Sequence, residues 1–314
     1  MKKLPLKTPA YKYLESSFRE WLDILGYAPS TVRAFPTHVR EFLYWMEQQG
    51  QTNIHKIDIP QIKAYYKQLS QRPNQRLGGG LSNSYLNVHL NALDKLLDYL
   101  RKQARIEIPP TGIPQETPNP EPVQPLTTKQ IHQLYEAITI YEEEHPVLAL
   151  RDHAILAVFY DCGLRRNEGV SLDVSDVHYD NRLLEVRTAK GGQPRFVPFS
   201  KTTSECLQNY RYESRPHLIK ERERTSAFFI GMRGNRMNGN SLNVRLKHIQ
   251  QQTNDPILQQ QPLHLHTLRH SIATHLLYQG MELEKVARFL GHRSLESTQI
   301  YTHLVDEALA KSTL

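Results

Sequence analysis

Cysteine is scarce in this chain of 314 residues, which contains only Cys162 and Cys206. Two cysteines without a metal-binding or disulfide spacing argue against a zinc finger or a disulfide-framed secreted domain. Long apolar runs are also lacking, since no stretch approaches the roughly 18 residues needed to span a membrane. Lys2 and Lys3 near the start have no apolar stretch behind them, unlike a signal peptide. We therefore expect a soluble, cytoplasmic protein with no membrane partner.

Acidic side chains are few in the first third of the chain. Residues 1–110 contain 16 Lys and Arg but 9 Asp and Glu, a net charge of +7, whereas residues 111–314 contain 23 of each kind. A locally basic region is typical of a protein that binds a polyanion, and nucleic acid is the commonest polyanion. A basic surface without such a partner is the alternative that charge alone leaves open.

Prolines gather in one segment, residues 108–125, which reads IPPTGIPQETPNPEPVQP. Proline lacks a backbone donor and disfavours helix, so this segment predicts an extended linker. We therefore expect an N-terminal domain at residues 1–107 and a second domain at residues 126–314.

The N-terminal region has the hydrophobic spacing of helices. Apolar residues recur at intervals of three and four within residues 30–50 and 82–103, and the segments 10–25 and 60–71 are amphipathic as well. Pro36 interrupts the first of these patterns and predicts a kink or a shortened first turn. About four helices, which form a small bundle, follow from these patterns.

The region after the linker combines helices with one short hairpin. Two strands, near residues 183–188 and 195–199, flank a Gly-Gly turn, which is a β-hairpin signal. Helices are expected at residues 128–142, 151–162, 201–213, 240–252, 267–279 and 282–290. The whole sequence therefore predicts a mainly α-helical protein with a small β-hairpin or sheet.

Six side chains of the second region carry groups that can act on a phosphate. They are Arg165, Lys190, His266, Arg269, His292 and Tyr301. Each has an ordinary structural explanation when it is taken alone. The arginines can pair with a carboxylate such as Glu168, the lysine can be a solvated turn residue, and the others can cap or pack. His266 lies three residues before Arg269, however, so both side chains can point to one spot at the start of a helix.

A metal site is the alternative raised by four neighbouring histidines, His264, His266, His270 and His275. The segment has no HExxH arrangement, and neither a carboxylate nor a cysteine lies within it. We expect His270 and His275 to be surface or packing residues. We also expect that any reaction of these residues with a phosphate requires no metal ion and no cofactor.

The six residues together suit one reaction, which is the metal-free attack of a hydroxyl group on a DNA phosphodiester. Arginine side chains can bind both non-bridging oxygens bidentately and stay charged at any working pH. Such preorganised donors stabilise the charge that builds up in the transition state. Tyrosine is a suitable nucleophile because its phosphate ester keeps the energy of the broken bond, so resealing needs no ATP. A lysine can protonate the leaving 5′-hydroxyl.

Five stretches of the chain resemble the tyrosine recombinase (phage integrase) family, and its Xer-like members in particular. GLRRNEGVSL resembles the first arginine box of the family, TAKGGQPRFVPF its lysine hairpin, and HLHTLRHSIATHLL its His-x-x-Arg-His box. LGHRSLESTQIYTH resembles the box that joins the last histidine to the nucleophile. FREWLDILGYAPSTVRAF resembles the start of the N-terminal core-binding domain of the family.

The resemblance implies how the scissile phosphate is bound. Arg165 and Arg269 would clamp it. His266 and His292 would bind its oxygens and assist proton transfer.

The resemblance also implies which residues make and break bonds. Tyr301 would be the nucleophile that forms a 3′-phosphotyrosine link, and Lys190 would be the general acid toward the leaving 5′-hydroxyl. Glu168 would be a carboxylate that orients the arginine site.

The fold and partners implied by the resemblance are specific. It implies an N-terminal four-helix, SAM-like core-binding domain and an α+β catalytic domain, which close on duplex DNA with the proline-rich segment as hinge. Four protomers, identical or including a second recombinase, would exchange strands between paired inverted-repeat core sites through a Holliday junction. Integration or excision of a mobile element, inversion, and chromosome dimer resolution during chromosome partition all remain open as the biological role.

Two other functions remain open from the sequence. A type IB topoisomerase uses a similar set of residues to relax DNA, although the helical N-terminal domain favours a recombinase. A DNA-binding protein that has lost catalysis is the second alternative, and the complete set of six residues argues against it. Gly169 departs from the first arginine box, where many relatives carry an apolar side chain, and the tail after Tyr301 is short.

Overall fold

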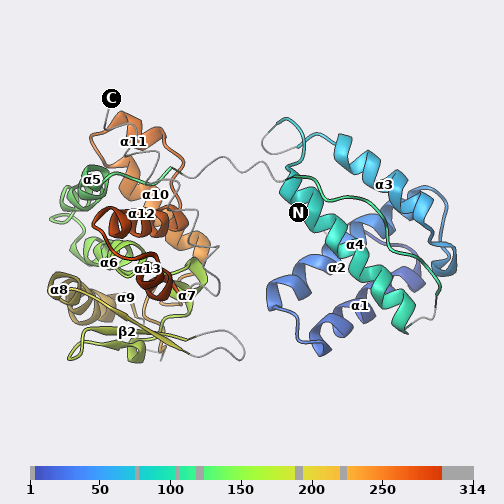
Figure 1. Cartoon of the computed structure of the whole chain (residues 1–314). Coiled ribbons are helices and arrows are strands. Elements are labelled where there is room, and N and C mark those ends of the chain that lie inside the picture. Colours follow the sequence, from blue (N-terminus) through green and yellow to red (C-terminus); the bar gives the residue numbers. More distant parts are fainter. Residues whose placement is uncertain are drawn as a thin grey trace. The chain divides into compact units, whose positions relative to one another are not determined.

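The computed structural model describes residues 4–74, 78–103, 106–117, 124–187, 194–219 and 225–291 of the chain. The chain divides into two compact units, Met1–Glu121 and Pro122–Leu314 (Figure 1), and each has its own hydrophobic core. The boundary between them falls within the proline-rich segment. Among the residues described, no helix is both long and apolar enough to cross a membrane.

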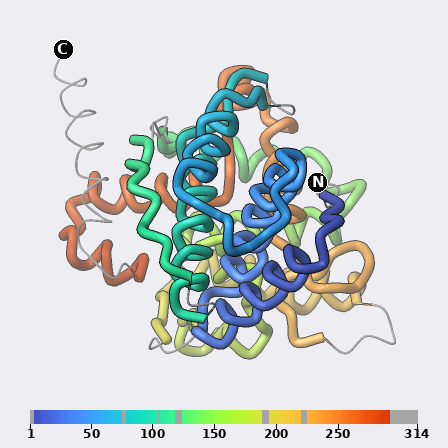
Figure 2. The backbone as a smooth tube through the Cα atoms, turned by 90° about the vertical axis from the view of Figure 1, so that its right-hand side faces the viewer, coloured from blue at the N-terminus to red at the C-terminus, as the bar shows by residue number. Residues whose placement is uncertain are grey.

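Helices build the described part of the N-terminal unit, where the backbone appears as blue to green tube in Figure 2. They are α1 (Pro9–Ile24), α2 (Pro29–Gln48), α3 (Ile59–Gln71) and α4 (Asn83–Gln103), with a 3-10 turn η1 (Ile54–Lys56) before α3. Their apolar stripes face a common core, and α2 packs against α1, α3 and α4. A capping box starts α3, because Asp58 Oδ1 accepts from the N–H of Gln61 at 2.9 Å and Gln61 Oε1 accepts from the N–H of Asp58 at 3.2 Å.

Helix α2 is 20 residues long and includes Pro36 in its interior, so this proline does not shorten it. The helix begins at Pro29, where the fixed φ of proline suits a first turn. The hydroxyl of Thr37 donates to the carbonyl of Arg33 at 3.0 Å. This bond gives a partner to a backbone acceptor beside the interruption.

Residues 106–117 form neither helix nor strand, yet they are attached to α4. The side chain of Asn87 donates to the carbonyl of Glu116 and accepts from its N–H, both at 2.8 Å. Arg101 donates to the carbonyl of Ile108 at 2.8 Å. Side chains of α4 thus satisfy backbone groups of an extended segment, and the first part of the proline-rich stretch belongs to the N-terminal unit.

A small antiparallel sheet lies in the C-terminal unit, with its strands in the order β1-β2-β3. These strands are β1 (Val177–His178), β2 (Leu183–Val186) and β3 (Arg195–Pro198), and Leu184 pairs with Val197. The sheet runs along the lower edge of this unit in Figure 1, with most of the helices above it. The antiparallel pairing of β2 and β3 confirms the two predicted strands, whose Gly-Gly connection lies outside the described residues. Strand β1 is an addition that the sequence pattern did not indicate.

The helices of the C-terminal unit surround a core that includes the inner face of this sheet. They are α5 (Thr128–Thr139), α6 (Pro146–Leu156), α7 (Arg166–Ser171), α8 (Lys201–Asn209), α9 (Arg215–Leu218), α10 (Gly239–Gln251), α11 (Pro256–Gln260), α12 (Leu265–Tyr278) and α13 (Leu283–Leu290). Helix α6 runs on into a π-helical turn, η2 (Ala157–Asp161). Helix α12 packs against η2, α10 and α13. The mainly α-helical fold with a small sheet is confirmed.

Gly169 in α7 is packed against an aromatic ring of η2. A Cβ atom at this position would lie 2.3 Å from Cζ of Phe159, and Phe159 is completely buried. The ring therefore fills the space that a side chain at residue 169 would occupy. This contact accounts for the glycine in the first arginine box.

Replacing Gly169 with alanine should destabilise the C-terminal unit by about 1–3 kcal/mol, because either the ring or α7 must move. That cost exceeds the gain of about 1 kcal/mol that alanine brings to a helix interior. Urea unfolding of Gly169→Ala and wild type measures the difference. Gly80→Ala is the matched control, since a Cβ there meets nothing within 4 Å. In the Phe159→Leu background the same alanine should cost less, and an equal cost in both backgrounds would contradict this explanation.

Candidate active site

Arg165 and Glu168 are held together by the start of α7. Arg165 is the N-cap residue, and its N–H donates to Oε2 of Glu168 at 2.7 Å. Its guanidinium Nη1 donates to Oε1 of the same carboxylate at 2.9 Å. A carboxylate in the first turn of a helix also faces the positive end of the helix dipole. The three-residue spacing of the sequence thus yields the expected pair.

The carboxylate of Glu168 also holds a third residue, Arg195, at the start of β3. Arg195 Nη1 and Nη2 donate to Oε1 and Oε2 of Glu168, both at 2.9 Å, which is the bidentate geometry of a strong ion pair. Arg269 Nη1 lies 3.8 Å from Oε2 of the same carboxylate. Three arginines therefore surround one carboxylate, whose side chain is 15% exposed.

The surrounding cations control the ionisation of Glu168. Burial is the largest single influence and would raise its pKa. The hydrogen bonds and charge of Arg195, together with the hydrogen bonds from Arg165, outweigh burial and lower the pKa of Glu168 to about 2. The carboxylate is therefore ionised at neutral pH and can balance the arginines around it.

The same three arginines bind the C-terminal end of α13. The bonds run from Arg195 Nε to the carbonyl of Phe289 (3.4 Å), from Arg269 Nη2 to that of Leu290 (2.6 Å), and from Arg165 Nη2 to that of Gly291 (3.0 Å). The last carbonyls of a helix have no partner within the helix and lie at the negative end of its dipole, so cations suit them. We refer to these three hydrogen bonds, which are donated to three consecutive carbonyls, as the carbonyl clamp. The clamp holds the backbone up to the residue before His292.

Gly291 ends α13 in the left-handed conformation, with φ 67° and ψ 49°. Glycine adopts this conformation without strain. A Cβ at this position would also lie 2.6 Å from Cδ of Arg195. A larger residue would therefore strain the end of the helix and displace one arginine of the clamp.

His266 and Arg269 project from the first turns of α12. Arg269 is 1% exposed and donates to the carbonyl of Gly163 at 2.6 Å, whereas the side chain of Arg165 is 41% exposed. Loss of solvation, followed by the charges of Arg269 and Arg165, lowers the pKa of His266. His266 is thus mainly neutral at neutral pH and lies within the electrostatic field of both arginines.

The neighbouring histidines have structural contacts. His275 Nδ1 is 2.8 Å from the hydroxyl of Tyr160, and its Nε2 is 2.9 Å from the carbonyl of Leu126. The ring of His270 stands edge-on to that of His266, with centroids 4.3 Å apart. The prediction that His275 is a packing residue is confirmed.

Three of the candidate residues, Lys190, His292 and Tyr301, lie outside the described residues. The described ends of the two strands that precede and follow Lys190 are each held by an arginine. Arg195 holds β3 through Glu168, as described above. Arg187, directly after β2, is held in turn by two aspartates.

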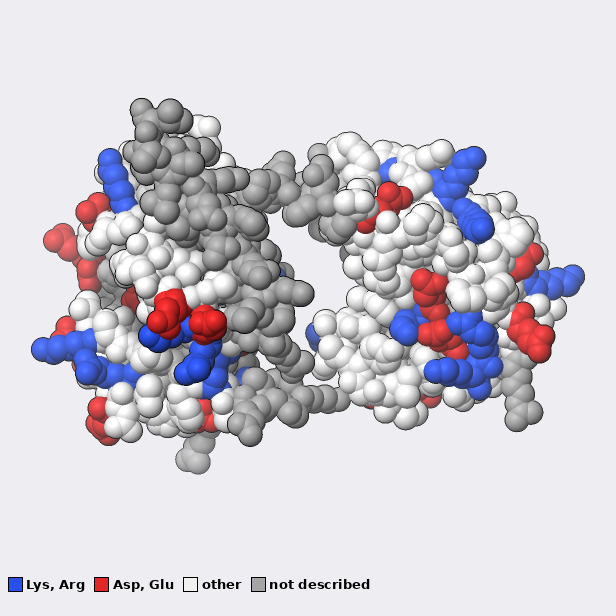
Figure 3. Space-filling model, viewed as in Figure 1, with Lys and Arg blue, Asp and Glu red and all other residues white. Residues whose placement is uncertain are grey.

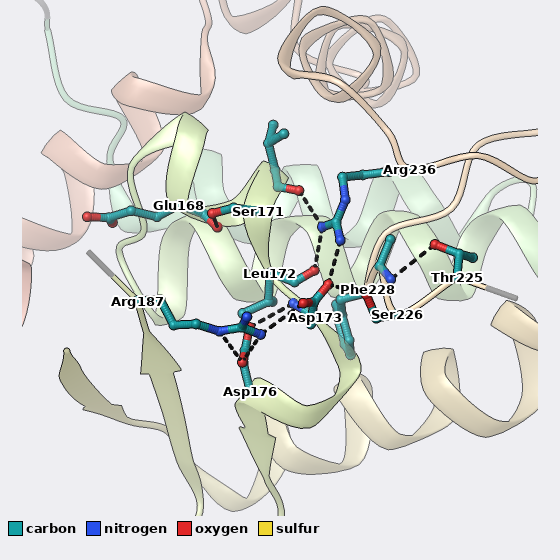
Figure 4. A network of polar contacts seen from close by, with 12 residues as sticks. Glu168, Ser171, Leu172, Asp173, Asp176, Arg187, Thr225, Ser226, Phe228 and Arg236 are labelled. Atoms are coloured by element: carbon teal, nitrogen blue, oxygen red, sulfur yellow. Dashed lines mark hydrogen bonds and ion pairs between the residues drawn. The ribbon is translucent and has the colours of Figure 1, made fainter. Parts of the chain in front are cut away.

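The contacts of Arg187 form part of a wider network (Figure 4). Arg187 Nε donates to Asp176 Oδ1 at 2.7 Å, and its Nη2 donates to Asp173 Oδ2 at 2.9 Å. Asp173 also accepts from Arg236 and, at 2.9 Å, from the hydroxyl of Ser226. Carboxylates on the segment after α7 thus anchor the end of β2, while Glu168 on α7 anchors the start of β3.

Arg195 is the residue of this site that the sequence motifs did not identify. A strand places alternate side chains on one face, and Val197, two residues later, is completely buried. An arginine on the same face as a buried valine must turn inward and find a carboxylate. The alternation in PRFVPF was therefore the signal that could have found it.

Replacing Glu168 with glutamine should destabilise the protein in a pH-dependent way. The pKa of Glu168 is lowered from 4.5 to about 2 by folding, so its contribution is present above pH 4.5 and is lost as the pH falls from 4.5 toward 2. We expect a loss on the order of 3 kcal/mol near neutral pH, which shrinks below pH 4.5. Urea unfolding of wild type and Glu168→Gln across this range measures it.

The control for this experiment is Glu205→Gln, because the side chain of Glu205 is 60% exposed on α8. This control should change the free energy of unfolding by less than about 0.5 kcal/mol. A loss in Glu168→Gln that stays constant across the pH range would rule out ionisation as its origin.

Residues 124–308 match the model of the Phage integrase family. The chain is 31% identical over 304 residues to tyrosine recombinase XerC 2 of Ralstonia nicotianae, covering 95% of this chain and 83% of that protein. It is 29% identical over 297 residues to tyrosine recombinase XerD of Lacticaseibacillus casei, covering 94% and 95%.

Solved structures show the same fold at lower identity. The XerH site-specific recombinase bound to difH substrate in a pre-cleavage complex has a TM-score of 0.69 at 21% identity, over 96% of this chain and 84% of that chain. A lambda integrase dimer bound to a COC′ core site has a TM-score of 0.63 at 13% identity, over 92% and 94%. The chain therefore belongs to the phage integrase family, as a Xer-like tyrosine recombinase, which is a DNA strand-transferring enzyme.

Proposed function

We propose that this protein is a site-specific recombinase that cuts and rejoins duplex DNA through a 3′-phosphotyrosine intermediate formed by Tyr301. The observation that supports this most directly is the convergence of Arg165, His266 and Arg269 beside the ionised Glu168. The two arginines supply cationic donors and His266 a neutral donor for a phosphodiester, in a chain that belongs to the tyrosine recombinases.

The two arginines are suited to binding the scissile phosphate because their orientation is fixed beforehand. Within the described part of the chain, Arg165 uses one N–H on Glu168 and one on Gly291, out of the five that a guanidinium carries. The side chain of Arg165 is partly exposed and can bind a ligand. The buried side chain of Arg269 adds a second positive charge to the site. Donors that need no reorganisation stabilise the transition state most effectively.

The remaining candidate catalytic residues would bind the phosphate oxygens and transfer protons. The lowered pKa of His266 makes its imidazole mainly neutral at neutral pH, so it can donate a hydrogen bond to a phosphate oxygen and exchange a proton. Lys190 would protonate the leaving 5′-hydroxyl, and His292 would bind a phosphate oxygen. These roles require neither a metal ion nor ATP. The carbonyl clamp holds the backbone from which His292 and, nine residues later, Tyr301 follow.

The proposed partner is double-stranded DNA that carries paired inverted-repeat core sites. XerH is described as bound to difH substrate and lambda integrase as bound to a COC′ core site, and residues 1–110 supply the net positive charge of the chain. On the face drawn in Figure 3, Lys and Arg are interspersed with Asp and Glu in both units. We propose that a tetramer, with or without a second recombinase, acts on cellular DNA in the cytoplasm and exchanges strands through a Holliday junction.

A covalent adduct tests the proposed reaction. Wild-type protein on a nicked suicide substrate containing its core site should form a protein–DNA adduct that survives denaturing gel electrophoresis, because the cut strand cannot religate. Tyr301→Phe should form none, since it lacks the attacking oxygen. Tyr278→Phe is the control, because Tyr278 on α12 is an exposed tyrosine outside the candidate set, and it should form the adduct normally.

The outcomes separate the proposed function from its alternatives. Absence of an adduct with wild type on the mapped core site would leave a DNA-binding protein without catalysis. Relaxation of a supercoiled plasmid that lacks any core site would indicate a topoisomerase of type IB.

Conservative replacement of either arginine should separate cleavage from DNA binding. Arg165→Lys keeps the charge but loses the planar fork that binds two oxygens, so cleavage should fall about 100-fold or more. DNA affinity should change less than about threefold, since many other phosphate contacts carry it. Gel-shift and cleavage assays at one salt concentration measure both quantities.

Arg166→Lys is the control for this pair of assays, because Arg166 is the exposed neighbour of Arg165. It should leave cleavage nearly unchanged. A parallel fall of binding and cleavage in Arg165→Lys would argue that this residue contributes affinity and has no special role in the reaction.

A further inference from the structure

The N-terminal unit contains three side chains with the donor set of a transition-metal site. His38 and Glu41 lie one turn apart on α2, and His89 lies on α4. His38 Nδ1 is 2.8 Å from His89 Nε2, and Glu41 Oε2 is 3.5 Å from the same nitrogen. These donor atoms all lie within 4.8 Å of one another.

We propose that His38, Glu41 and His89 bind a zinc ion, or a similar divalent transition-metal ion, which links α2 to α4. Two imidazoles and one carboxylate are three of the four ligands of a tetrahedral site, and water completes it. Zinc bonds of about 2.0–2.1 Å require ligand atoms roughly 3.3 Å apart. The carboxylate oxygen already has this separation from His89, and the two imidazole nitrogens need to separate by only about half an ångström.

The outer atoms of two of these ligands are already engaged. Glu41 Oε1 accepts a hydrogen bond from Arg72, so Oε2 is the oxygen that faces the histidines. His89 Nδ1 is 3.4 Å from the hydroxyl of Tyr65, so Nε2 is the nitrogen that faces the cluster. A hydrogen bond on the far nitrogen is a regular feature of metal-bound histidine, because it fixes the ring and its tautomer.

The two imidazoles differ in their exposure to solvent. His89 is completely buried and His38 is partly buried. A metal ion binds the neutral form of imidazole, so its affinity should fall at acidic pH.

The ligand chemistry selects among the available ions. Imidazole nitrogen suits zinc, cobalt, nickel and copper, whereas magnesium and calcium prefer sites built from oxygen ligands. Arg72 adds a positive charge near the carboxylate, but it binds the outer oxygen, away from the two nitrogens. We therefore expect zinc or cobalt to bind, and magnesium and calcium to compete weakly.

The position of this zinc site gives it a structural role. Tyr65 lies on α3 and Arg72 caps its C-terminal end, so the site and its supporting contacts join α2, α3 and α4. The candidate catalytic residues belong to the other compact unit. Bound metal should therefore raise the stability of the N-terminal unit by mass action.

Metal titration of the full-length protein tests this proposal. Protein stripped with EDTA and dialysed should bind one Zn²⁺ per chain by calorimetry, and Co²⁺ should give the visible absorption of a tetrahedral site. His38→Gln and Glu41→Gln should each weaken this binding by at least about tenfold, because each removes a ligand. Tyr65→Phe should weaken it by about tenfold without removing a ligand. His55→Gln, which changes an exposed histidine of the same unit, should bind as wild type does.

Two results would overturn the proposal. The first is failure of wild-type protein to bind Zn²⁺ at about 100 μM, a concentration well above the dissociation constants of protein zinc sites. This result would mean that the cluster is only a hydrogen-bonded network. Retention of the ion in His38→Gln with its loss in His266→Gln would place it in the other unit. Circular dichroism of His38→Gln checks that the fold is intact, and the partly exposed position of His38 makes this variant safer than one at the buried His89.

Discussion

One mostly buried carboxylate, that of Glu168, holds the C-terminal unit together at the candidate site. Three guanidinium groups lie around it, and each would be repelled by the other two without the anion. Removing one partner from a buried ion pair costs on the order of 3–5 kcal/mol, because the charge that remains has no counterion and little water around it. Against the opposing effect of burial, the surrounding arginines lower the pKa of Glu168 to about 2.

The carboxylate works together with the carbonyl clamp. Arg165, Arg195 and Arg269 each use one group of donors on or near Glu168 and another on a carbonyl at the end of α13. Lysine could not do this, because its single ammonium group lacks the planar fork that spans two acceptors. The start of α7, the start of β3, the first turns of α12 and the end of α13 are therefore joined through arginine side chains, so that residues far apart in the sequence meet at one place.

Sequence reasoning recovered the parts of this site that depend on local patterns. Helical periodicity and the Gly-Gly turn located most elements, and the spacing of Arg165 to Glu168 and of His266 to Arg269 indicated which side chains share a turn. It missed Arg195, although the alternation in PRFVPF was a signal for it. It could not find the carbonyl clamp, because that depends on which carbonyls lie beside the arginines after folding. The sequence also could not explain Gly169, because a phenyl ring from another segment occupies the space that a side chain there would need. Nor did it indicate the short helices α7, α9 and α11.

The histidines show why density along the chain is a poor guide to a metal site. The four between residues 264 and 275 extend from the N-cap of α12 to its last turn, where His275 contacts Tyr160 and the carbonyl of Leu126. His38 and His89 are separated by 51 residues, yet their nitrogens are 2.8 Å apart. The packing of α2 against α4 brings them together, and a carboxylate one turn from His38 completes the donor set. A donor set of this kind is created by helix packing, and its ligands carry no sequence signature apart from the i, i+3 pair of His38 and Glu41.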